Sequence, residues 1–305
     1  MSVLDRRVVL VTGKGGVGKT TVSALIALRA ARSGRRVLLC ETSGATQVPP
    51  LFGVRGRGYE PVEVAPGLHT LSITSEAAIE DYIVMQLRFR RLYRMVFRNR
   101  VVGPFVDAVP GLHDLIQLGK VFDLERTQEA GRPAWDLIVI DAPATGHGLT
   151  MLASPRAMME LTVAGPFHDN ARDVAALFED PRRTALVLVS LPEDMPLKET
   201  EELYQRLGTA RPLVRGLVLN ELHPPPVPDV ALYADNRGRL ADGADTAGLE
   251  ALALADSALR RSARQDRARD RLNALGPPVI GLPFLYRRDL GAADLAALLP
   301  AVEGL

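Results

Sequence analysis

A loop of eight residues near the N-terminus constrains this chain more than any other feature. It reads Gly13-Lys-Gly-Gly-Val-Gly-Lys-Thr20, directly follows the apolar run Val8–Val11, and precedes a helix-like stretch over residues 21–31. In a strand, loop and helix of this pattern, the glycines let successive backbone N–H groups turn inward, and the helix adds its positive N-terminal end. The loop therefore predicts a site for the phosphate groups of a nucleotide.

The pattern also assigns roles within this loop. Lys19 supplies a charge for the β- and γ-phosphates, and the Thr20 hydroxyl is placed to bind Mg²⁺. Lys14 is a second lysine that such a loop does not require; it either reaches a nucleotide on a facing subunit or is a surface lysine. The predicted nucleotide-binding residues of this segment are Gly13, Lys14, Gly15, Gly16, Val17, Gly18, Lys19, Thr20 and Thr21.

The composition fits a globular protein and disfavours several classes. Of the 305 residues, 47% are hydrophobic and 24% charged, and the net charge of +1 gives no global field for nucleic acid. Cys40 is the only cysteine, so neither an internal disulfide nor a Cys-x-x-Cys zinc site is expected. No apolar run approaches the ~20 residues of a membrane span, and no signal peptide precedes the first strand. We expect a cytoplasmic protein, either free or peripheral to a membrane.

Short apolar runs alternate with longer helical stretches along the chain. Several runs are almost continuous in Val, Ile and Leu, as in strands buried on both faces of a parallel sheet. The alternation predicts a doubly wound α/β fold over a single domain of residues 1–305, with helices on both faces and ligands at the carboxyl ends of the strands. The predicted strands are Val8–Val11, Val37–Cys40, Leu68–Ile73, Leu137–Ile140, Ala185–Val189, Gly216–Leu219 and Val279–Leu282.

Two segments are predicted to be additions to this core. Residues 76–127 lack strand signals and are predicted to form a helical insertion, a candidate client- or partner-binding subdomain. Within it, Tyr82–Arg100 has the pattern of a basic amphipathic helix, for which a core-facing helix with a solvated arginine face is favoured over docking on a membrane surface or a partner. Residues 224–247 are rich in Pro, Asp and Gly and predict an exposed connection before a helix over Leu249–Leu275.

A carboxylate follows the predicted strand Leu137–Ile140. Asp141 is expected at the carboxyl end of a buried strand, where it binds Mg²⁺ directly or through water. The alternative is a carboxylate that caps the next helix, but the phosphate loop favours the Mg²⁺ role. Pro143 and Gly146 then indicate a loop that responds to the γ-phosphate.

The segment Asp141-Ala-Pro-Ala-Thr-Gly-His147 resembles the switch II segment of the ArsA family of P-loop ATPases, whose pattern is Asp-Thr-Ala-Pro-Thr-Gly-His. The phosphate loop, with its early Lys14, resembles the deviant Walker A loop of the MinD/ParA/ArsA group. Further similarities follow in the family's order and extend the resemblance over nearly the whole chain. They are Pro110–Leu112, Phe178–Pro181, Leu191–Thr200, Val218–Glu221 and Gly281–Leu285.

The resemblance implies an ATPase that binds ATP and Mg²⁺ and dimerises around the nucleotide. It implies that Lys14 contacts phosphate across the dimer interface, that Asn220 recognises adenine, and that Pro283 and Phe284 pack on the base. On its chemistry alone the Asn220 amide matches the adenine edge, and the alternative is an Asn that caps a turn. The candidate catalytic residues are Lys14, Lys19, Glu41 and Asp141, and the candidate metal ligands are Thr20 and Asp141.

The segment after Val37–Cys40 departs from the family pattern. Alignment with switch I puts Ser43 where a water-activating aspartate is expected, and a hydroxyl does not accept a proton at neutral pH as a carboxylate does. Glu41 is the nearest acid: it activates water, holds a magnesium-bound water, or faces solvent. In this respect the chain is similar to a subgroup of bacterial ArsA-like ATPases that occur as paired proteins.

Two functional hypotheses result. The favoured one is a Mg²⁺-dependent ATPase, slow alone, that couples dimer closure to a client or a membrane-associated partner, as a homodimer or with an ArsA-like paralogue. The alternative is a nucleotide-dependent binding module with little hydrolysis of its own. DNA partitioning is disfavoured by the near-neutral charge, and the single cysteine disfavours the metalloid site of the arsenite pump.

Overall fold

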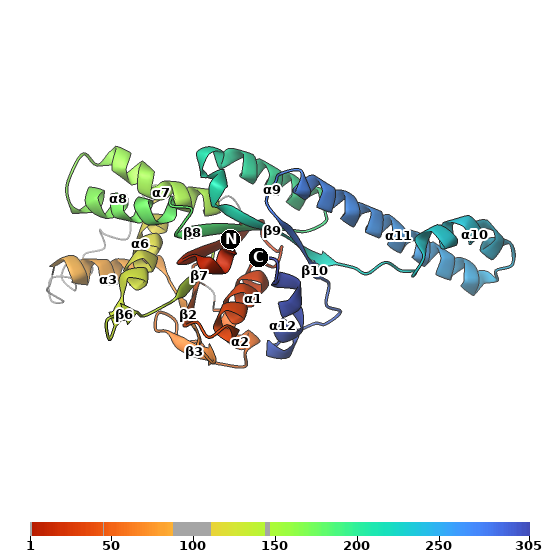
Figure 1. Cartoon of the computed structure of the whole chain (residues 1–305), viewed down its shortest axis with the longest axis horizontal. Coiled ribbons are helices and arrows are strands. Elements are labelled where there is room, and N and C mark those ends of the chain that lie inside the picture. Colours follow the sequence, from red (N-terminus) through yellow and green to blue (C-terminus); the bar gives the residue numbers. More distant parts are fainter. Residues whose placement is uncertain (1, 45, 88–110, 144–146) are drawn as a thin grey trace.

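The computed structural model describes residues 2–44, 46–87, 111–143 and 147–305, and an eight-stranded sheet lies at its centre (Figure 1). The strand order is β10-β9-β8-β1-β7-β2-β4-β3, and each neighbouring pair is parallel except β3 with β4. The predicted α/β class is confirmed. The strands are β1 (Val8–Gly13), β2 (Val37–Glu41), β3 (Val62–Ala65), β4 (Leu68–Ser72), β7 (Leu137–Asp141), β8 (Thr184–Ser190), β9 (Val214–Leu222) and β10 (Val279–Pro283), with a separate hairpin of β5 (Gln128–Glu129) and β6 (Arg132–Pro133).

Helices cover both faces of the sheet, because strand side chains alternate between two apolar clusters. In β1, Val8 and Leu10 belong to one cluster, and Val9 and Val11 belong to the other. Helices α3, α6, α7, α8, α9 and α11 contribute to the first cluster, and α1, α2 and α12 contribute to the second. The helices are α1 (Lys19–Arg32), α2 (Val48–Leu51), α3 (Ser75–Leu87), α6 (Leu112–Arg126), α7 (His147–Leu161), α8 (Pro166–Phe178), α9 (Asp194–Arg206), α10 (Val230–Asp242), α11 (Thr246–Asn273) and α12 (Ala292–Leu298), with short 3₁₀ turns at Val3–Asp5, Gly208–Leu213 and Leu299–Val302.

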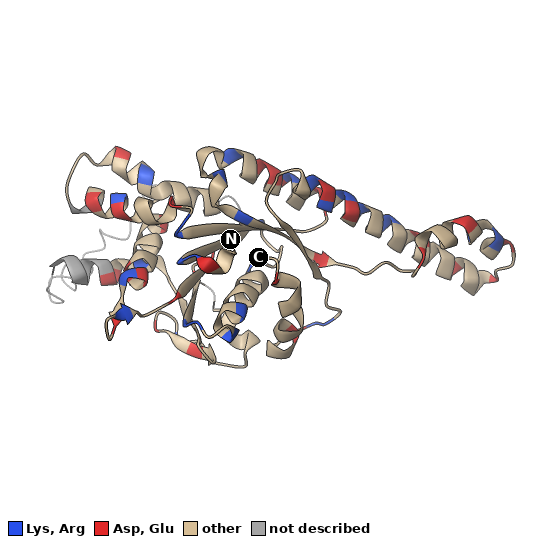
Figure 2. Cartoon of the chain, in the orientation of Figure 1, with Lys and Arg blue, Asp and Glu red and all other residues tan. Residues whose placement is uncertain are grey.

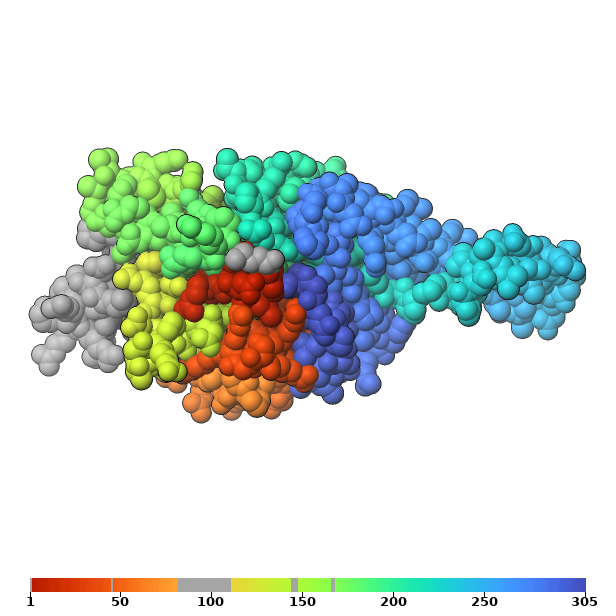
Figure 3. All heavy atoms as spheres, in the orientation of Figure 1, coloured from red at the N-terminus to blue at the C-terminus, as the bar shows by residue number. Residues whose placement is uncertain are grey.

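The strand register brings the candidate carboxylates beside the phosphate loop. Strand β7 lies between β1 and β2, so that Asp141 is opposite Val11 on one side and Glu41 on the other. The carboxyl ends of parallel strands meet at one edge of the sheet. The C-terminal helix α12 packs beside α1, which follows the phosphate loop (Figure 3).

Residues 224–247, which we predicted to be an exposed connection, are largely exposed as expected where they form α10, but the sequence analysis did not predict this helix. Asp229 Oδ1 accepts a hydrogen bond from the backbone N–H of Leu232 at 2.8 Å, and Asp245 Oδ1 accepts one from Gly248 at 2.8 Å. The aspartates that indicated a loop therefore cap α10 and α11. Together α10 and the outer part of α11 extend from the sheet as an arm, and no residue of α10 is buried (Figure 1).

The structure describes both ends of the predicted helical insertion over residues 76–127. Helices α3 and α6 pack together and bury Ile79 and Leu118 in the first apolar cluster. Residues 88–110, with most of the predicted basic amphipathic helix, lie outside the described residues. Among the helices that the structure describes, none is both long and apolar enough to cross a membrane.

Candidate nucleotide and metal site

The phosphate loop connects β1 to α1, and its glycines are required by close approaches. A Cβ atom on Gly13 would lie 2.3 Å from the carbonyl oxygen of Val189, and one on Gly18 would lie 2.2 Å from Asn220 Nδ2. Gly18 also has φ of 87°, in the left-handed region that favours glycine. Val17 is fully buried in the second apolar cluster and so fixes the loop to the core. The geometry fits the loop that the sequence predicts.

Lys19 begins α1 with its side chain held within the loop. It is 8% exposed, and its Nζ donates a hydrogen bond to the carbonyl oxygen of Lys14 at 3.0 Å. Burial lowers the pKa of Lys19, and the negative charge of Asp141 partly opposes this shift. A buried ammonium group at the N-terminal end of a helix is suited to bind a polyanion.

Asp141 accepts hydrogen bonds from two side chains of α1. Thr20 Oγ1 donates to Asp141 Oδ2 at 2.7 Å, and Ser23 Oγ donates to Asp141 Oδ1 at 3.1 Å. Burial raises the pKa of Asp141, while these two hydrogen bonds and Lys19 oppose the shift. Sequence reasoning missed Ser23, although a residue three positions after Thr20 lies on the same helical face.

Glu41 is almost completely buried at the end of β2, with 1% of its surface exposed. Its Oε1 accepts hydrogen bonds from the backbone N–H groups of Gln47 at 2.5 Å and Val48 at 3.0 Å. Its Oε2 is also buried and has no hydrogen-bond partner in the part of the chain that the structure describes. Burial raises the pKa of Glu41, and the neighbouring Asp141 adds to the shift. By contrast, Ser43 is exposed.

These oxygens fit a magnesium ion. A hydroxyl from Thr20, the carboxylate of Asp141 and the unpartnered Oε2 of Glu41 are hard donors, which Mg²⁺ prefers, and Mg²⁺ keeps several waters. A buried carboxylate oxygen without a partner is costly unless a cation, a water or a proton accompanies it. The structure brings the predicted ligands Thr20 and Asp141 into contact, and their binding of Mg²⁺ stays a prediction.

The predicted base-binding residues lie at the ends of β9 and β10. Asn220 is 7% exposed, and its Nδ2 donates to the carbonyl oxygen of Val17 at 3.0 Å, so its amide supports the phosphate loop. Pro283 ends β10, and the Phe284 ring stacks on His223 with ring centroids 4.7 Å apart. Recognition of adenine by Asn220, through its remaining acceptor, stays a prediction.

Lys14 contacts a helix of its own subunit. Its Nζ lies 2.7 Å from Glu199 Oε1 on α9, and both side chains are partly exposed. Sequence reasoning had no signal for this pair, because the two residues are far apart in the chain. The predicted contact of Lys14 across a dimer interface stays a prediction.

Gln117 joins the helical insertion to the segment after Glu41. From α6, its Nε2 donates to the carbonyl oxygens of Thr42 and Ile73, each at 3.1 Å. Thr42 Oγ1 in turn donates to the carbonyl oxygen of Asp141 at 2.9 Å. A chain of hydrogen bonds thus runs from α6 to the candidate metal site. Residues 144–146, which include most of the predicted γ-phosphate loop, lie outside the described residues.

Gln117→Leu is expected to lower the free energy of unfolding by about 2 kcal/mol, because it leaves two buried carbonyl groups without this donor. Urea denaturation measures the change. Gln128→Leu, in the exposed hairpin strand β5, is the control and should shift stability by less than about 0.5 kcal/mol. Equal stability of the two variants would mean that Gln117 does not hold α6 to this segment.

A phosphate loop with hard oxygen ligands at the edge of a parallel sheet defines the class of P-loop nucleoside triphosphatases. The chain matches the family model described as anion-transporting ATPase over residues 6–164 and 161–238. It is 32% identical over 320 residues to ATPase BagA of Mycobacterium tuberculosis, an alignment that covers 98% of this chain and 92% of BagA.

The chain also matches relatives at lower identity. The chain is 27% identical over 267 residues to ATPase GET3 of Meyerozyma guilliermondii, covering 75% of this chain and 74% of that protein. It is 29% identical over 244 residues to an arsenical pump-driving ATPase of Escherichia coli, covering 70% of this chain and 39% of that protein. The chain belongs to the anion-transporting ATPase, or ArsA, family, and it is an ATPase.

Proposed function

We propose that this ATPase is Mg²⁺-dependent and works as a dimer that closes around ATP. The observation that carries the metal requirement is the buried cluster of Thr20, Asp141 and Glu41 beside Lys19, in which Glu41 Oε2 has no partner among the described residues. Mg²⁺ bound to these residues would neutralise charge on the β- and γ-phosphates. Lys19 and the loop amides bind the phosphates, and Thr20 and Asp141 hold the metal.

We assign to Glu41 the water-activating role of the aspartate that the family pattern has at the position of Ser43. Its Oε1 is fixed by two backbone N–H groups, so the orientation of its free Oε2 is set before nucleotide binds. Burial raises its pKa, which makes it a better proton acceptor than an ordinary glutamate. We therefore assign Glu41 to the water that attacks the γ-phosphate, either directly or through a metal-bound water.

The metal-free protein should lose stability as pH rises, because burial raises the pKa of Glu41 and of Asp141 in the folded chain. A carboxyl group with a raised pKa binds its proton more tightly when folded. The stability that this tighter proton binding contributes is therefore complete below the pKa of the unfolded chain, about 4. It is lost as pH rises through the pKa of the folded chain. Thermal unfolding in chelator should show a smaller decline with pH for Glu41→Gln than for wild type, and Mg²⁺ with ATP should reduce the difference. The same decline in both proteins would mean that the pKa of Glu41 is not raised in the folded chain.

The dimer part of the proposal rests on Lys14, whose position in the loop is that of the family's early lysine. In the single subunit this lysine is paired with Glu199, so an approach to a facing nucleotide has to exchange that carboxylate for phosphate. A partly exposed ion pair contributes at most about 1 kcal/mol, so the exchange is inexpensive.

Lys14→Ala is expected to bind ATP but to lose most ATP-dependent association and turnover, because a subunit without this lysine cannot contact the facing phosphates. Glu199→Gln keeps the lysine and removes its competing partner, so its association should equal or exceed that of wild type. Light scattering with a non-hydrolysable ATP analogue measures both. Wild-type association and turnover in Lys14→Ala would make Lys14 a surface lysine.

We also propose that the helical insertion binds a client. Helices α3 and α6 of the insertion connect to the metal site through Gln117, so closure of the site can move a surface that binds a client or a membrane-associated partner. We propose that the protein acts in the cytoplasm or at the membrane surface, without nucleic acid. The exposed Ser43 favours a second candidate, a nucleotide-dependent binding module that hydrolyses ATP efficiently only with an ArsA-like paralogue.

A further inference from the structure

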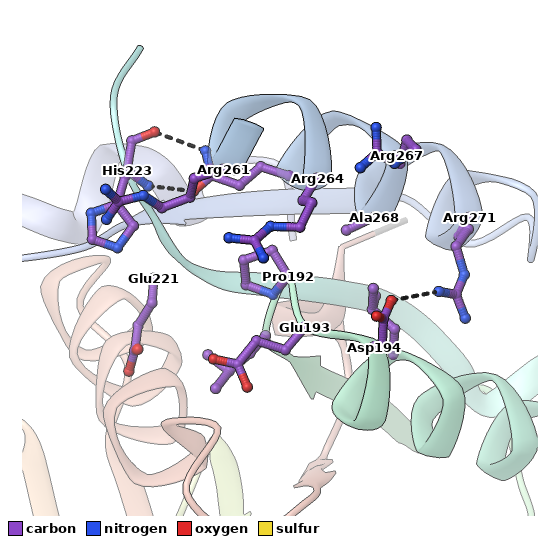
Figure 4. Close-up of a pocket in the computed structure, with 13 residues that line it drawn as sticks. Pro192, Glu193, Asp194, Glu221, His223, Arg261, Arg264, Arg267, Ala268 and Arg271 are labelled. Atoms are coloured by element: carbon purple, nitrogen blue, oxygen red, sulfur yellow. Dashed lines mark hydrogen bonds and ion pairs between the residues drawn. The ribbon is translucent and has the colours of Figure 1, made fainter. Parts of the chain in front are cut away.

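A cavity of about 460 Å³ lies between α9, α11 and the segments that follow β8 and β9 (Figure 4). One wall is formed by arginines that recur every three or four residues along α11, so they share one face of the helix. These are Arg261, Arg264, Arg267 and Arg271. The concentration of positive charge on this part of α11 is visible beside the interspersed carboxylates in Figure 2.

Only the last of these arginines has a counterion in the part of the chain that the structure describes. Arg271 Nη2 lies 2.8 Å from Glu201 Oε2, and its Nη1 lies 3.8 Å from Asp194 Oδ1. Arg261, Arg264 and Arg267 make no ion pair with a described residue. The arginine wall therefore has unused guanidinium donors.

The opposite side of the cavity contains carboxylates that are directed elsewhere. Glu193 and Glu221 line the cavity, but in Figure 4 their side chains extend away from Arg261 and Arg264. Burial raises the pKa of Glu221, and the charge of Glu193 adds to the shift. These two carboxylates thus repel each other and do not neutralise the arginines.

The cavity wall is held in a fixed shape by Gln265, which is 7% exposed. Its Oε1 accepts a hydrogen bond from the backbone N–H of His223 at 2.7 Å, and its Nε2 donates to the His223 carbonyl oxygen at 2.9 Å. The end of β9 is thereby fastened to α11. Glu221 has φ of 60°, a left-handed conformation that is uncommon for a residue with a side chain and tends to occur at functional sites.

The cavity is separate from the phosphate loop. Helix α11 contributes Ala268 and Leu272 to the first apolar cluster, whereas α1, which follows the loop, contributes to the second. No residue of the phosphate loop or of α1 lines the cavity, whereas His223 lines it and also stacks on Phe284 of the predicted base site, so the cavity borders the nucleotide site without containing the phosphate loop.

We propose that this cavity binds a small organic phosphate. Its phosphate group is held by Arg261, Arg264 and Arg267, because planar guanidinium groups match phosphate oxygens with paired hydrogen bonds. Its organic part rests on the apolar floor formed by Leu191, Pro192 and Leu197. The volume falls within the range of small-molecule sites.

Calorimetric titration of the full chain tests this assignment. Phenyl phosphate and inorganic phosphate are titrated into protein whose phosphate loop is already saturated with Mg²⁺ and a non-hydrolysable ATP analogue. We expect saturable binding of phenyl phosphate, and weaker binding of inorganic phosphate because it lacks a group for the apolar floor. The double variant Arg261→Ala/Arg264→Ala should weaken phenyl phosphate binding about 100-fold, since each lost charged hydrogen bond costs about tenfold.

Arg269→Ala is the matched control, because Arg269 lies on the same helix but does not line the cavity. It should change the affinity by less than about threefold. Absence of binding to the saturated protein, or an equal loss in the control and the double variant, would overturn the proposal. If the chain binds no ATP analogue, the proposed ATP cycle fails, while phenyl phosphate binding that depends on Arg261 and Arg264 still supports the cavity site.

Discussion

Lys19→Ala is expected to abolish measurable ATP turnover and to weaken nucleotide binding by about 10- to 100-fold, the equivalent of one strong charged hydrogen bond. Lys19 is the buried ammonium group of the loop, and among the described residues it donates a hydrogen bond only to the carbonyl oxygen of Lys14. Without it, the β- and γ-phosphates lose the charge that the loop places against them. Thermal-shift titration with Mg²⁺ and ATP measures the loss, since a ligand stabilises the folded protein in proportion to its occupancy.

The control for this prediction is Lys198→Ala. Lys198 is exposed on α9, and among the described residues its one ion pair is with Glu202 of the same helix, at 3.8 Å. It should therefore leave both stability and the ATP response almost unchanged. Equal stabilisation of Lys19→Ala and Lys198→Ala by ATP would be incompatible with a phosphate site at Gly13–Thr20.

Glu41→Gln is expected to reduce turnover by about 10²- to 10⁴-fold, the usual effect of losing a positioned base. Affinity for ATP should stay close to wild type, because Glu41 is assigned to the attacking water rather than to the phosphates. The amide oxygen can still accept the hydrogen bonds from Gln47 and Val48, so the local backbone should be retained. Steady-state hydrolysis and equilibrium binding, measured on the same preparations, separate the two effects.

Glu60→Gln is the matched control, because Glu60 is an exposed glutamate distant in sequence from the metal ligands. If a paralogue supplies the missing carboxylate instead, its addition should raise turnover and make Glu41→Gln matter less. If the isolated Glu41→Gln variant hydrolyses ATP as fast as wild type, neither Glu41 nor a paralogue activates the water. Asp141 would then be the next candidate.

The central sheet and the phosphate loop were accessible from the sequence because their physical requirements are local. Strands buried on both faces read as continuous apolar runs, and the glycines at positions 13 and 18 are explained by the close approaches of Val189 and Asn220. The edge strand β3 was missed because it has four residues, of which only Val64 is buried. Helix α10 was missed because the capping Asp229 resembles a loop signal when its tertiary position is unknown.

The contacts around the site depend on tertiary structure and could not be predicted in this way. Lys14 meets Glu199, and Gln117 meets Thr42, only because α9 and α6 pack on the same face of the sheet. The sequence identified Glu41 as the nearest acid to Ser43, but its burial and its unpartnered oxygen required the structure. The spacing of the arginines on α11 likewise did not indicate a binding site, because the cavity that they line is formed only in the folded chain.

The most direct test of the account is the mass of the wild-type chain in solution with a non-hydrolysable ATP analogue, measured by light scattering in the presence and absence of Mg²⁺. We expect a monomer with analogue and chelator and a dimer with analogue and Mg²⁺. A monomer under both conditions, at analogue concentrations that saturate the phosphate loop, would contradict a cycle in which two copies of this chain close around ATP.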